Sequence, residues 1–323
     1  MSKARELAEL GAVYDSGALS NRNLVINGAM QVFQRGTSFT NSSTAYNADR
    51  WSVDNNADGG GRSTDAPDGF TYSLKVDPGS GSNAALRHAI ELPAAGEGGV
   101  FRSGQKFTLS FYVKSENAGE DLKIFAASGT NVNATTTSQV SAQTIGTTTT
   151  SWVRHIFTFT SNNVGGSDTC YNIVPFVTTP SGAVYWTGFQ LELVTEATDF
   201  EHRSFGDEMS RCQRYFTRFG GTNTFDLVAL GGMGTSSTVA QVGCIFPTRM
   251  RATPSVAMTD LALADSVNSQ VTVNSVAISS SVANDQMAWM NFNTSGSLTA
   301  HRPYYVRVNS NSTTGGLKFD AEL

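Results

Sequence analysis

Apolar and polar side chains alternate one by one in several segments of this chain, and this alternation constrains the fold more than any other feature. Residues 107–114 read FTLSFYVK, and Val153, Phe157 and Phe159 repeat the same spacing. A period of two is typical of strands with one buried face. In residues 185–193 the same period predicts a buried face made of the following residues: Tyr185, Phe189, Leu191 and Leu193.

The polar residues of the chain are mostly uncharged, which also favours strands over helices. Only 15% of residues are charged, whereas Ser, Thr, Asn and Gly together make up about 125 of the 323 residues. Ser and Asn compete with helical hydrogen bonds, Thr is stiff at χ1, and Gly weakens helix interiors. We therefore predict an all-β chain, with a jelly-roll or β-sandwich domain followed by a second, smaller β-sandwich domain.

One segment departs from the strand pattern and is predicted to be a helix that joins the two β domains. Ser204 is suited to cap the amide of Asp207, and acidic residues occupy the first turn. The apolar residues that follow at helical spacing form one stripe, which we expect to be buried: Phe205, Met209, Cys212 and Phe216.

The length of the chain favours two domains, because 323 residues exceed the usual size of one. We predict an N-terminal attachment arm over residues 1–22, with an arm packed on its own domain as the alternative, a jelly-roll domain over 23–203, the joining helix over 204–218, and a C-terminal β domain over 219–323. Within the arm, Ser2 is suited to cap a short helix that stops at Gly11.

Charge and cysteine content exclude several classes of partner. The net charge is −5 and the basic residues are scattered, so we expect no nucleic-acid binding. We also expect no signal peptide and no membrane insertion, because no apolar run reaches the length of a membrane span. Cys170, Cys212 and Cys244 are odd in number and far apart, which predicts buried thiols rather than disulfides or a zinc site.

The segment GSGSNA, which begins at Gly79, matches the spacing of a dinucleotide-binding fingerprint. Only eight residues separate Ala84 from Pro93, which is too few for the helix that would present its N-terminus to a pyrophosphate. We therefore predict a hairpin loop here and no bound cofactor.

Residues 54–65 have the oxygen spacing of a calcium-binding loop, with Asp54, Asn56 and Asp58 at positions one, three and five and Asp65 at position twelve. The twelfth residue is a short Asp rather than Glu, and flanking helices are not predicted. Because Asx-rich turns form without metal, a solvated turn is the favoured interpretation and calcium remains an alternative.

The sequence contains no closely spaced catalytic group, so we expect no catalytic residues and no enzymatic activity. The histidines lack metal-binding spacing and are expected to be structural or at the surface: His88, His155, His202 and His301. Carboxylates on distant strands can still meet in space. The tryptophans are expected in the core, although exposed ones can stack on sugar rings: Trp51, Trp152, Trp186 and Trp289.

Several segments resemble the tail-fibre and minor virion proteins of tailed bacteriophages. The opening strand of their first β domain resembles NLVINGAM at residues 23–30, QRGT at 34–37 and ADRW at 48–51. The end of that domain resembles FQLE at 189–192 and ATDFEHR at 197–203. Leu193 and Asp199 depart from that pattern, which usually has an acid and a proline there.

The resemblance extends over most of the chain. CQRYF at residues 212–216 is similar to the end of the joining helix in these proteins. MRATPSV at 250–256 is similar to the start of a strand in their C-terminal domains, and ARELAEL at 4–10 to the start of related proteins of marine phages. Arg50 and Glu192 both lie in the matching segments. We predict that they form an ion pair, which would join the first and last strands of the first domain.

The resemblance implies a first domain like those of carbohydrate-binding modules, homotrimeric assembly, and a place in a virion assembled in the host cytoplasm. The implied partners are copies of the chain itself, other phage tail or head proteins and, weakly, host-surface glycans. A tail fibre for host attachment is the favoured interpretation. A head fibre or decoration protein without receptor binding is one alternative, and a polysaccharide depolymerase is another.

Overall fold

The computed structural model of the chain is almost entirely β-structure and divides into two compact units. It describes residues 22–40, 46–53, 57–265, 270–279 and 283–323. The first unit extends to Glu208, and the second runs from Met209 to Glu322. The predicted N-terminal arm, with its short helix, lies outside the described residues except for Arg22. In the described ranges, no helix combines the length and hydrophobicity needed to span a membrane.

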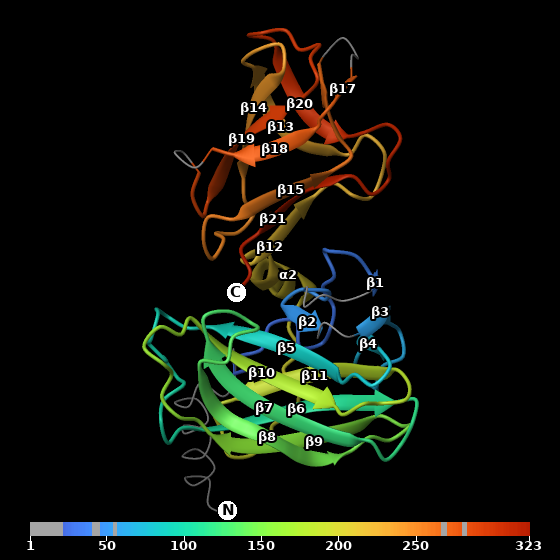
Figure 1. The fold of residues 1–323 in the computed structure, drawn as a ribbon, viewed down its shortest axis with the longest axis vertical. Coiled ribbons are helices and arrows are strands. Elements are labelled where there is room, and N and C mark those ends of the chain that lie inside the picture. Colours follow the sequence, from blue (N-terminus) through green and yellow to red (C-terminus); the bar gives the residue numbers. More distant parts are fainter. Residues whose placement is uncertain (1–21, 41–45, 54–56, 266–269, 280–282) are drawn as a thin grey trace, which may run out of the picture. The chain divides into compact units, whose positions relative to one another are not determined.

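The first unit consists of two antiparallel sheets, as the alternating sequence predicts (Figure 1). The six-stranded sheet has the order β1-β3-β4-β11-β6-β9, and the five-stranded sheet has the order β2-β5-β10-β7-β8. Neighbouring strands are mostly not consecutive in the chain, which is the connectivity of a jelly-roll sandwich. The strands are β1 Ser38–Thr40, β2 Trp51–Val53, β3 Ala57–Ser63, β4 Ser73–Pro78, β5 Ala84–Glu91, β6 Lys106–Ser115, β7 Asp121–Gly129, β8 Thr137–Thr147, β9 Val153–Thr160, β10 Cys170–Val177 and β11 Val184–Glu192.

The core of the first unit lies between the two sheets and is rich in aromatic rings. Phe107 and Leu109 of β6 are fully buried and pair with Phe159 and Phe157 of β9, as the alternation predicts. Val153, predicted on the same face of β9, is 36% exposed, so the prediction for that strand is only partly correct. Phe101 continues this core by stacking on the ring of Phe107 at 4.9 Å between centroids. Each such buried side chain stabilises the fold by about 1.5–3 kcal/mol.

Strand β11 changes face along its length, which its sequence pattern did not predict. Trp186 is fully buried and Tyr185 lies on the outer side, the reverse of the prediction, whereas Phe189 faces the core as predicted. The register with β6 shifts around Gly188, whose φ is 67°. This bulge adds a residue and reverses the alternation. Leu193, also predicted on the buried face, follows the strand and is 46% exposed.

The glycine-rich segment at residues 79–83 is a turn between the two sheets. β4 belongs to the six-stranded sheet and β5 to the five-stranded sheet, so the predicted hairpin is wrong. The amide of Ser82 donates a hydrogen bond to the carbonyl of Gly79 at 3.0 Å, and Gly81 has a φ of 72°. Alternation locates strands in the sequence but does not tell which sheet each strand joins.

The joining helix is shorter than predicted and its apolar stripe is incomplete. Helix α2 spans Phe205–Gln213, and the hydroxyl of Ser204 accepts the amide of Asp207 at 3.2 Å, as the predicted cap requires. Cys212 is fully buried, but Phe205 is 57% exposed. Phe216, predicted on the helix, lies in β12 because this segment pairs with β21 near the C-terminus. Tertiary strand pairing overrides the local helical spacing here.

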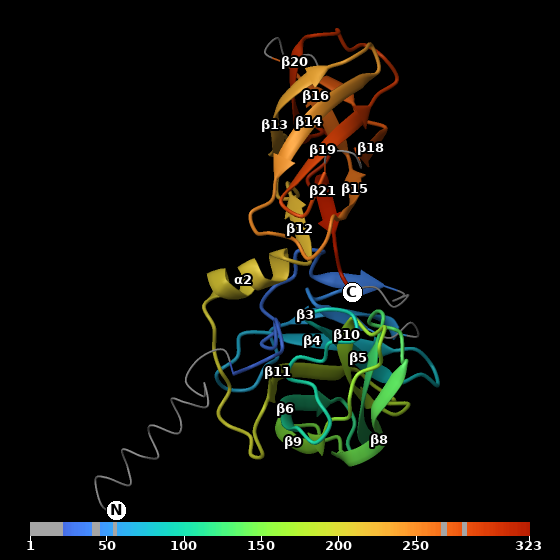
Figure 2. The same cartoon turned by 90° about the vertical axis from the view of Figure 1, so that its left-hand side faces the viewer.

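The second unit packs a three-stranded sheet, in the order β12-β21-β15, against a seven-stranded sheet, in the order β17-β16-β20-β13-β14-β19-β18. Figures 1 and 2 show β13, β14 and β19 side by side in the larger sheet. The strands are β12 Phe216–Phe219, β13 Leu227–Gly234, β14 Val239–Ile245, β15 Ser255–Thr259, β16 Leu261–Ala264, β17 Gln270–Thr272, β18 Ser275–Ile278, β19 Met287–Asn293, β20 Pro303–Val308 and β21 Gly316–Asp320.

The core of the second unit includes the alternating C-terminal segment. Leu317 and Phe319 of β21 are fully buried, as their spacing predicts, although the strand ends at Asp320 rather than at the last residue. All three cysteines are free and buried, in agreement with the prediction.

Candidate functional site

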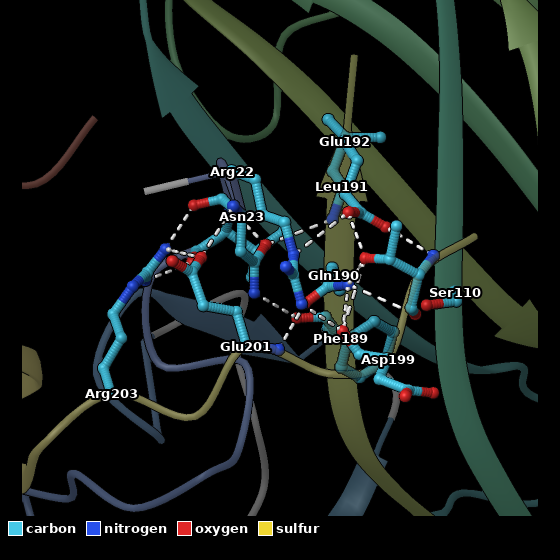
Figure 3. A network of polar contacts seen from close by, with 12 residues as sticks. Arg22, Asn23, Ser110, Phe189, Gln190, Leu191, Glu192, Asp199, Glu201 and Arg203 are labelled. Carbon is cyan, nitrogen blue, oxygen red and sulfur yellow. Dashed lines mark hydrogen bonds and ion pairs between the residues drawn. The ribbon is translucent and has the colours of Figure 1, made fainter. Parts of the chain in front are cut away.

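Residues in the segments that resemble phage proteins meet in one buried network at the end of the first unit (Figure 3). Glu192 closes β11 and is 1% exposed, and its carboxylate accepts a hydrogen bond from Thr198 Oγ1 at 2.5 Å. The same carboxylate lies 3.4 Å from Arg22 Nε. The segment after β11 and the start of the described chain are therefore held to the same strand.

Amide side chains complete this network. Asn23 Nδ2 donates to the carbonyl of Phe189 at 3.0 Å, and Asn23 Oδ1 accepts the amide of Leu191 at 3.1 Å. Gln190 Oε1 accepts the amide of Glu201 at 2.7 Å. Leaving such buried groups unpaired would be costly, so these bonds fix the path of the chain at both ends of the unit. The role of these motif residues is structural.

The predicted ion pair between Arg50 and Glu192 is wrong. Arg50 is 1% exposed and donates a hydrogen bond from Nη2 to the carbonyl of Ala89 in β5. Arg50 immediately precedes β2 of the five-stranded sheet, whereas Glu192 belongs to the six-stranded sheet. Arg22, which the sequence reasoning did not single out, joins the first segment to the last strand in its place.

Where the structure describes the candidate calcium loop, most of its residues form a β-strand rather than a loop. Residues 54–56 lie outside the described ranges, and residues 57–63 form β3, which pairs with β1 and β4. Positions that would wrap around an ion are therefore extended strand. Both carboxylate oxygens of Asp65 accept hydrogen bonds from other side chains. Among the described residues, no three His, Cys, Asp or Glu side chains are grouped to hold a metal.

The histidines of the first unit contact hydrophobic or aromatic surroundings. The ring of His88 lies 4.6 Å from that of Trp51, and His88 Nε2 accepts the amide of Ile26 at 3.4 Å. Complete burial lowers the pKa of His88 well below its ordinary value of 6.5, so the ring is neutral. Burial also lowers the pKa of His155, and the His202 ring lies among aromatic rings.

A different group of side chains forms the candidate binding site, on the outer face of the six-stranded sheet. We call it the outer-face cluster, and it consists of Asp65, Lys75, Lys114, Glu116, Trp152 and Tyr185. Lys114 projects from β6, Lys75 from β4 and Tyr185 from β11, while the other three lie in segments that flank the strands. Because β4, β11 and β6 are adjacent, residues far apart in sequence come together.

Asp65 organises one side of the outer-face cluster. Lys114 Nζ lies 2.5 Å from Asp65 Oδ2, and Trp152 Nε1 donates to Asp65 Oδ1 at 2.9 Å. The hydrogen bond from Lys114 lowers the pKa of Asp65 below its ordinary value of 3.8, although desolvation acts in the opposite direction. The carboxylate is therefore ionised at neutral pH and holds the indole ring in place.

Tyr185 organises the other side. The Lys114 ammonium lies 5.6 Å from the centroid of the Tyr185 ring, and the Tyr185 hydroxyl lies 3.3 Å from Glu116 Oε1. Burial raises the pKa of Tyr185, so the phenol remains protonated. Lys75 pairs with Asp77 at 2.8 Å, and this hydrogen bond raises the pKa of Lys75. The cluster thus offers two half-buried aromatic rings beside charged donors and acceptors.

The tryptophans divide between core and surface, so the prediction that all four are in the core is only partly correct. Trp51 and Trp186 are fully buried in the first unit. Trp152 is half-buried in the outer-face cluster, and Trp289 of the second unit is 36% exposed. The sequence did not distinguish Trp152 and Trp289 from the two core tryptophans, because all four lie in or next to strands.

No protein-family profile matches the chain. No curated protein matches it either. The chain is similar to the solved CBM22-1 xylan-binding domain of Xyn10C from Paenibacillus barcinonensis, with 13% identity and a TM-score of 0.36 over 54% of this chain and 96% of that one.

Two other solved structures show likenesses of the same order. The enzymatically active domain of tailspike protein 4 of bacteriophage CBA120 has 15% identity and a TM-score of 0.36, over 54% of this chain and 22% of that one. A putative sugar binding protein from Bacteroides thetaiotaomicron has 13% identity and a TM-score of 0.35, over 53% of this chain and all of that one. Identities this low leave ligand and activity to be argued from the chain itself.

Proposed function

We propose that this chain is a structural protein of a tailed-phage virion, a homotrimeric tail fibre that takes part in host attachment. In this proposal the outer-face cluster of the first unit binds glycans of the host surface, and the protein binds without cleaving. The virion, assembled in the host cytoplasm, is the place of action.

The observation that carries the glycan part of this proposal is the composition of the outer-face cluster. Trp152 and Tyr185 present flat apolar surfaces with fixed orientation, because each is held by a hydrogen bond to a carboxylate. Sugar rings have apolar faces that stack on such rings and hydroxyl groups that need hydrogen-bond partners. Lys114 and Glu116 supply those partners next to the rings.

The virion part of this proposal is supported by the motif segments. The residues that resemble phage structural proteins, such as Asn23, Gln190 and Glu192, are buried and connect backbone segments. Because the matching residues hold the fold together, the resemblance indicates a shared domain structure rather than a shared catalytic activity. Because the matching segments contain no catalytic signature, we favour a tail fibre over a depolymerase.

The expected affinity for one glycan is low, because the cluster lies on the face of a sheet. Repeated sites raise the overall strength of attachment, since binding of a second site becomes intramolecular once the first is occupied. A trimer with three clusters, repeated over several fibres, would gain about 10²–10⁴ in avidity without any new contact.

Calorimetric titration of the purified chain with host envelope polysaccharide tests the glycan site. Trp152→Ala and Tyr185→Ala are each expected to weaken binding by about 5- to 30-fold, which corresponds to the loss of a stacking surface worth about 1–2 kcal/mol. Phe125→Ala is the matched control, because Phe125 is a half-buried aromatic residue on the outer face of the other sheet. Equal loss in all three variants, or none in any, would refute the cluster as the site.

Antibody labelling of intact virions, viewed by electron microscopy, tests the location. Label at the tail fibres is the expected result. Label confined to the head would favour a head fibre or decoration protein over the tail fibre. Incubation of the protein with the same polysaccharide is expected to release no new reducing ends, and their release would contradict a purely binding role.

A further inference from the structure

The seven-stranded sheet of the second unit has one face in the core and one face turned to solvent. In β14, Ala240 and Val242 are buried, whereas Ile245 is 77% exposed. In the neighbouring β19, Met290 is buried and Met287 is 39% exposed. Ile245 pairs directly with Met287, so their side chains project together from the outer side of the sheet.

The outer side of this sheet is largely apolar over three neighbouring strands, and the amides of Gln241 and Asn291 on it are hydrogen-bonded to each other at 3.0 Å. We call this surface the apolar face and define it by Leu227, Leu230, Met233, Ile245, Met287 and Trp289, which lie on β13, β14 and β19. These strands are adjacent in the order β13-β14-β19 and lie side by side in Figure 2. Of the twelve large apolar side chains exposed in the described part of the chain, seven belong to the second unit, and six of those form this face.

Trp289 lies flat on this face because its neighbour in β14 is a glycine. Gly243 pairs with Trp289, and a Cβ atom at Gly243 would lie 3.2 Å from Trp289 Cε3. The indole therefore occupies the space of a missing side chain and adds a broad apolar surface without projecting far. Large flat aromatic side chains of this kind anchor protein interfaces.

Charge is nearly absent from this sheet. Among the residues of its seven strands only Arg307 is charged, although 15% of the whole chain is charged. Arg307 is already engaged, since its Nη2 donates to Gln270 Oε1 at 3.1 Å and its guanidinium lies 4.7 Å from the Phe225 ring centroid. The apolar face therefore offers a partner mainly hydrophobic contact, beside the neutral amide groups of Gln241 and Asn291.

We infer that the apolar face is where copies of this chain pack against one another. A surface that meets its own copy must avoid placing like charges together, and this face satisfies that condition in a chain of net charge −5. A foreign protein or a charged glycan would draw on charged groups for orientation, and the one charge in the strands of this sheet, on Arg307 opposite Leu227, is already engaged by Gln270. Exposed apolar patches of this kind are uncommon on proteins that remain monomeric.

This inference rests on the homotrimer of the proposed function and deepens it by naming the surface that joins the copies. Rotation about a common axis would bring the apolar face of each copy against its neighbours and remove its side chains from water. Glycan binding by the first unit does not depend on this surface, so the two proposals can fail separately.

Sedimentation velocity of the full chain at micromolar concentration tests the inference. We expect the native protein to sediment with about three times the chain mass of 34.4 kDa. Ile245→Glu places a charge within the apolar face and is expected to weaken self-association at least about 100-fold, because burying an unpaired charge at an interface is costly. Trp289→Gln is a milder second variant, for use if the first does not fold by circular dichroism.

The matched control is Ile156→Glu, since Ile156 is 54% exposed on β9 of the first unit and lies outside the apolar face. We expect this control to retain the trimer. A native trimer that survives both variants of the apolar face would overturn the inference and leave the homotrimer standing. A native protein of 34.4 kDa would overturn both. A dimer dissociated only by the apolar-face variants would support the surface and contradict three copies.

Discussion

The outer faces of two sheets in this molecule have opposite chemistry, although both sheets are antiparallel and both pack on apolar cores. In the first unit, β6, β4 and β11 turn Lys114, Lys75 and Tyr185 outward, and these groups pair with carboxylates. In the second unit, β14 and β19 turn Ile245 and Trp289 outward without a charged neighbour on their strands. The same alternation therefore produces one surface suited to polar ligands and another suited to an apolar partner.

The largest expected effect is a difference in the free energy of unfolding between variants of a buried and of a partly exposed tryptophan. Trp186→Ala removes a fully buried ring and should lower the free energy of unfolding of the first unit by about 3–5 kcal/mol. Trp289→Ala should change the stability of a dissociated chain by no more than about 1 kcal/mol, because the ring is partly exposed. Urea unfolding followed by circular dichroism measures both. Similar losses in both variants would mean that Trp289 belongs to a core.

The next effect concerns pH and is confined to the first unit. Because the folded pKa of His88 lies well below 6.5, the unfolded chain takes up a proton that the folded chain does not. Stability should therefore fall as pH decreases below about 6.5, by up to about 1.4 kcal/mol per pH unit. Urea titrations at several pH values should show this slope in the native chain and a smaller slope in His88→Gln, where His155, whose pKa burial also lowers, still contributes. An unchanged slope in the variant would assign the effect to groups other than His88.

The next comparison replaces one glycine by alanine in each of the two sheets and compares the loss of stability. At Gly188, with φ 67°, an added Cβ would lie 2.8 Å from both the Phe70 and Tyr112 rings, so Gly188→Ala should destabilise the first unit by about 1–3 kcal/mol. Gly243→Ala should cost little stability, because only the exposed Trp289 ring must move. Thermal unfolding separates these outcomes. The second variant should instead weaken self-association, and equal stability losses would contradict this difference between the faces.

The smallest expected effect concerns the ion pair in the outer-face cluster. The pKa of Asp65 is lowered, so its contribution to stability is complete above about pH 4 and is lost as pH falls through the folded pKa. Asp65→Asn should reduce the acid sensitivity of the first unit slightly and weaken glycan binding modestly, because a neutral amide oxygen accepts the Trp152 N–H less strongly than a carboxylate. Unfolding midpoints measured between neutral and acid pH test the first outcome. Unchanged binding by the variant would mean that Asp65 does not position the ring.

Local alternation predicted the all-β fold and the buried faces of strands such as β6 and β21, because period two is a property of neighbouring residues. It failed where one residue was added, as at Gly188, where the bulge exchanges Tyr185 with Trp186. It also failed at Phe216, where pairing with β21 outweighs helical spacing. These outcomes depend on partners far away in the chain, which local spacing does not encode.

The candidate site was harder to predict than the fold. Asp65, Lys114, Trp152 and Tyr185 come from four distant segments, and their meeting depends on the order β4-β11-β6. The available signal was a set of polar or aromatic residues at outward positions of predicted strands, such as Lys114 after Val113. The Arg50 hypothesis failed for the same reason, because it assumed that the first and last strands lie close enough for Arg50 to pair with Glu192, whereas β2 and β11 belong to different sheets.

The central claim is that one face of the molecule binds host glycans while another joins its copies. Sedimentation velocity with fluorescently labelled host polysaccharide reads both properties in one measurement. Tyr185→Ala should lose the polysaccharide and keep the trimer mass, and Ile245→Glu should lose the trimer mass and keep weak binding by single chains. A single variant that abolishes both properties, or two variants that affect neither, would contradict the separation of the two faces.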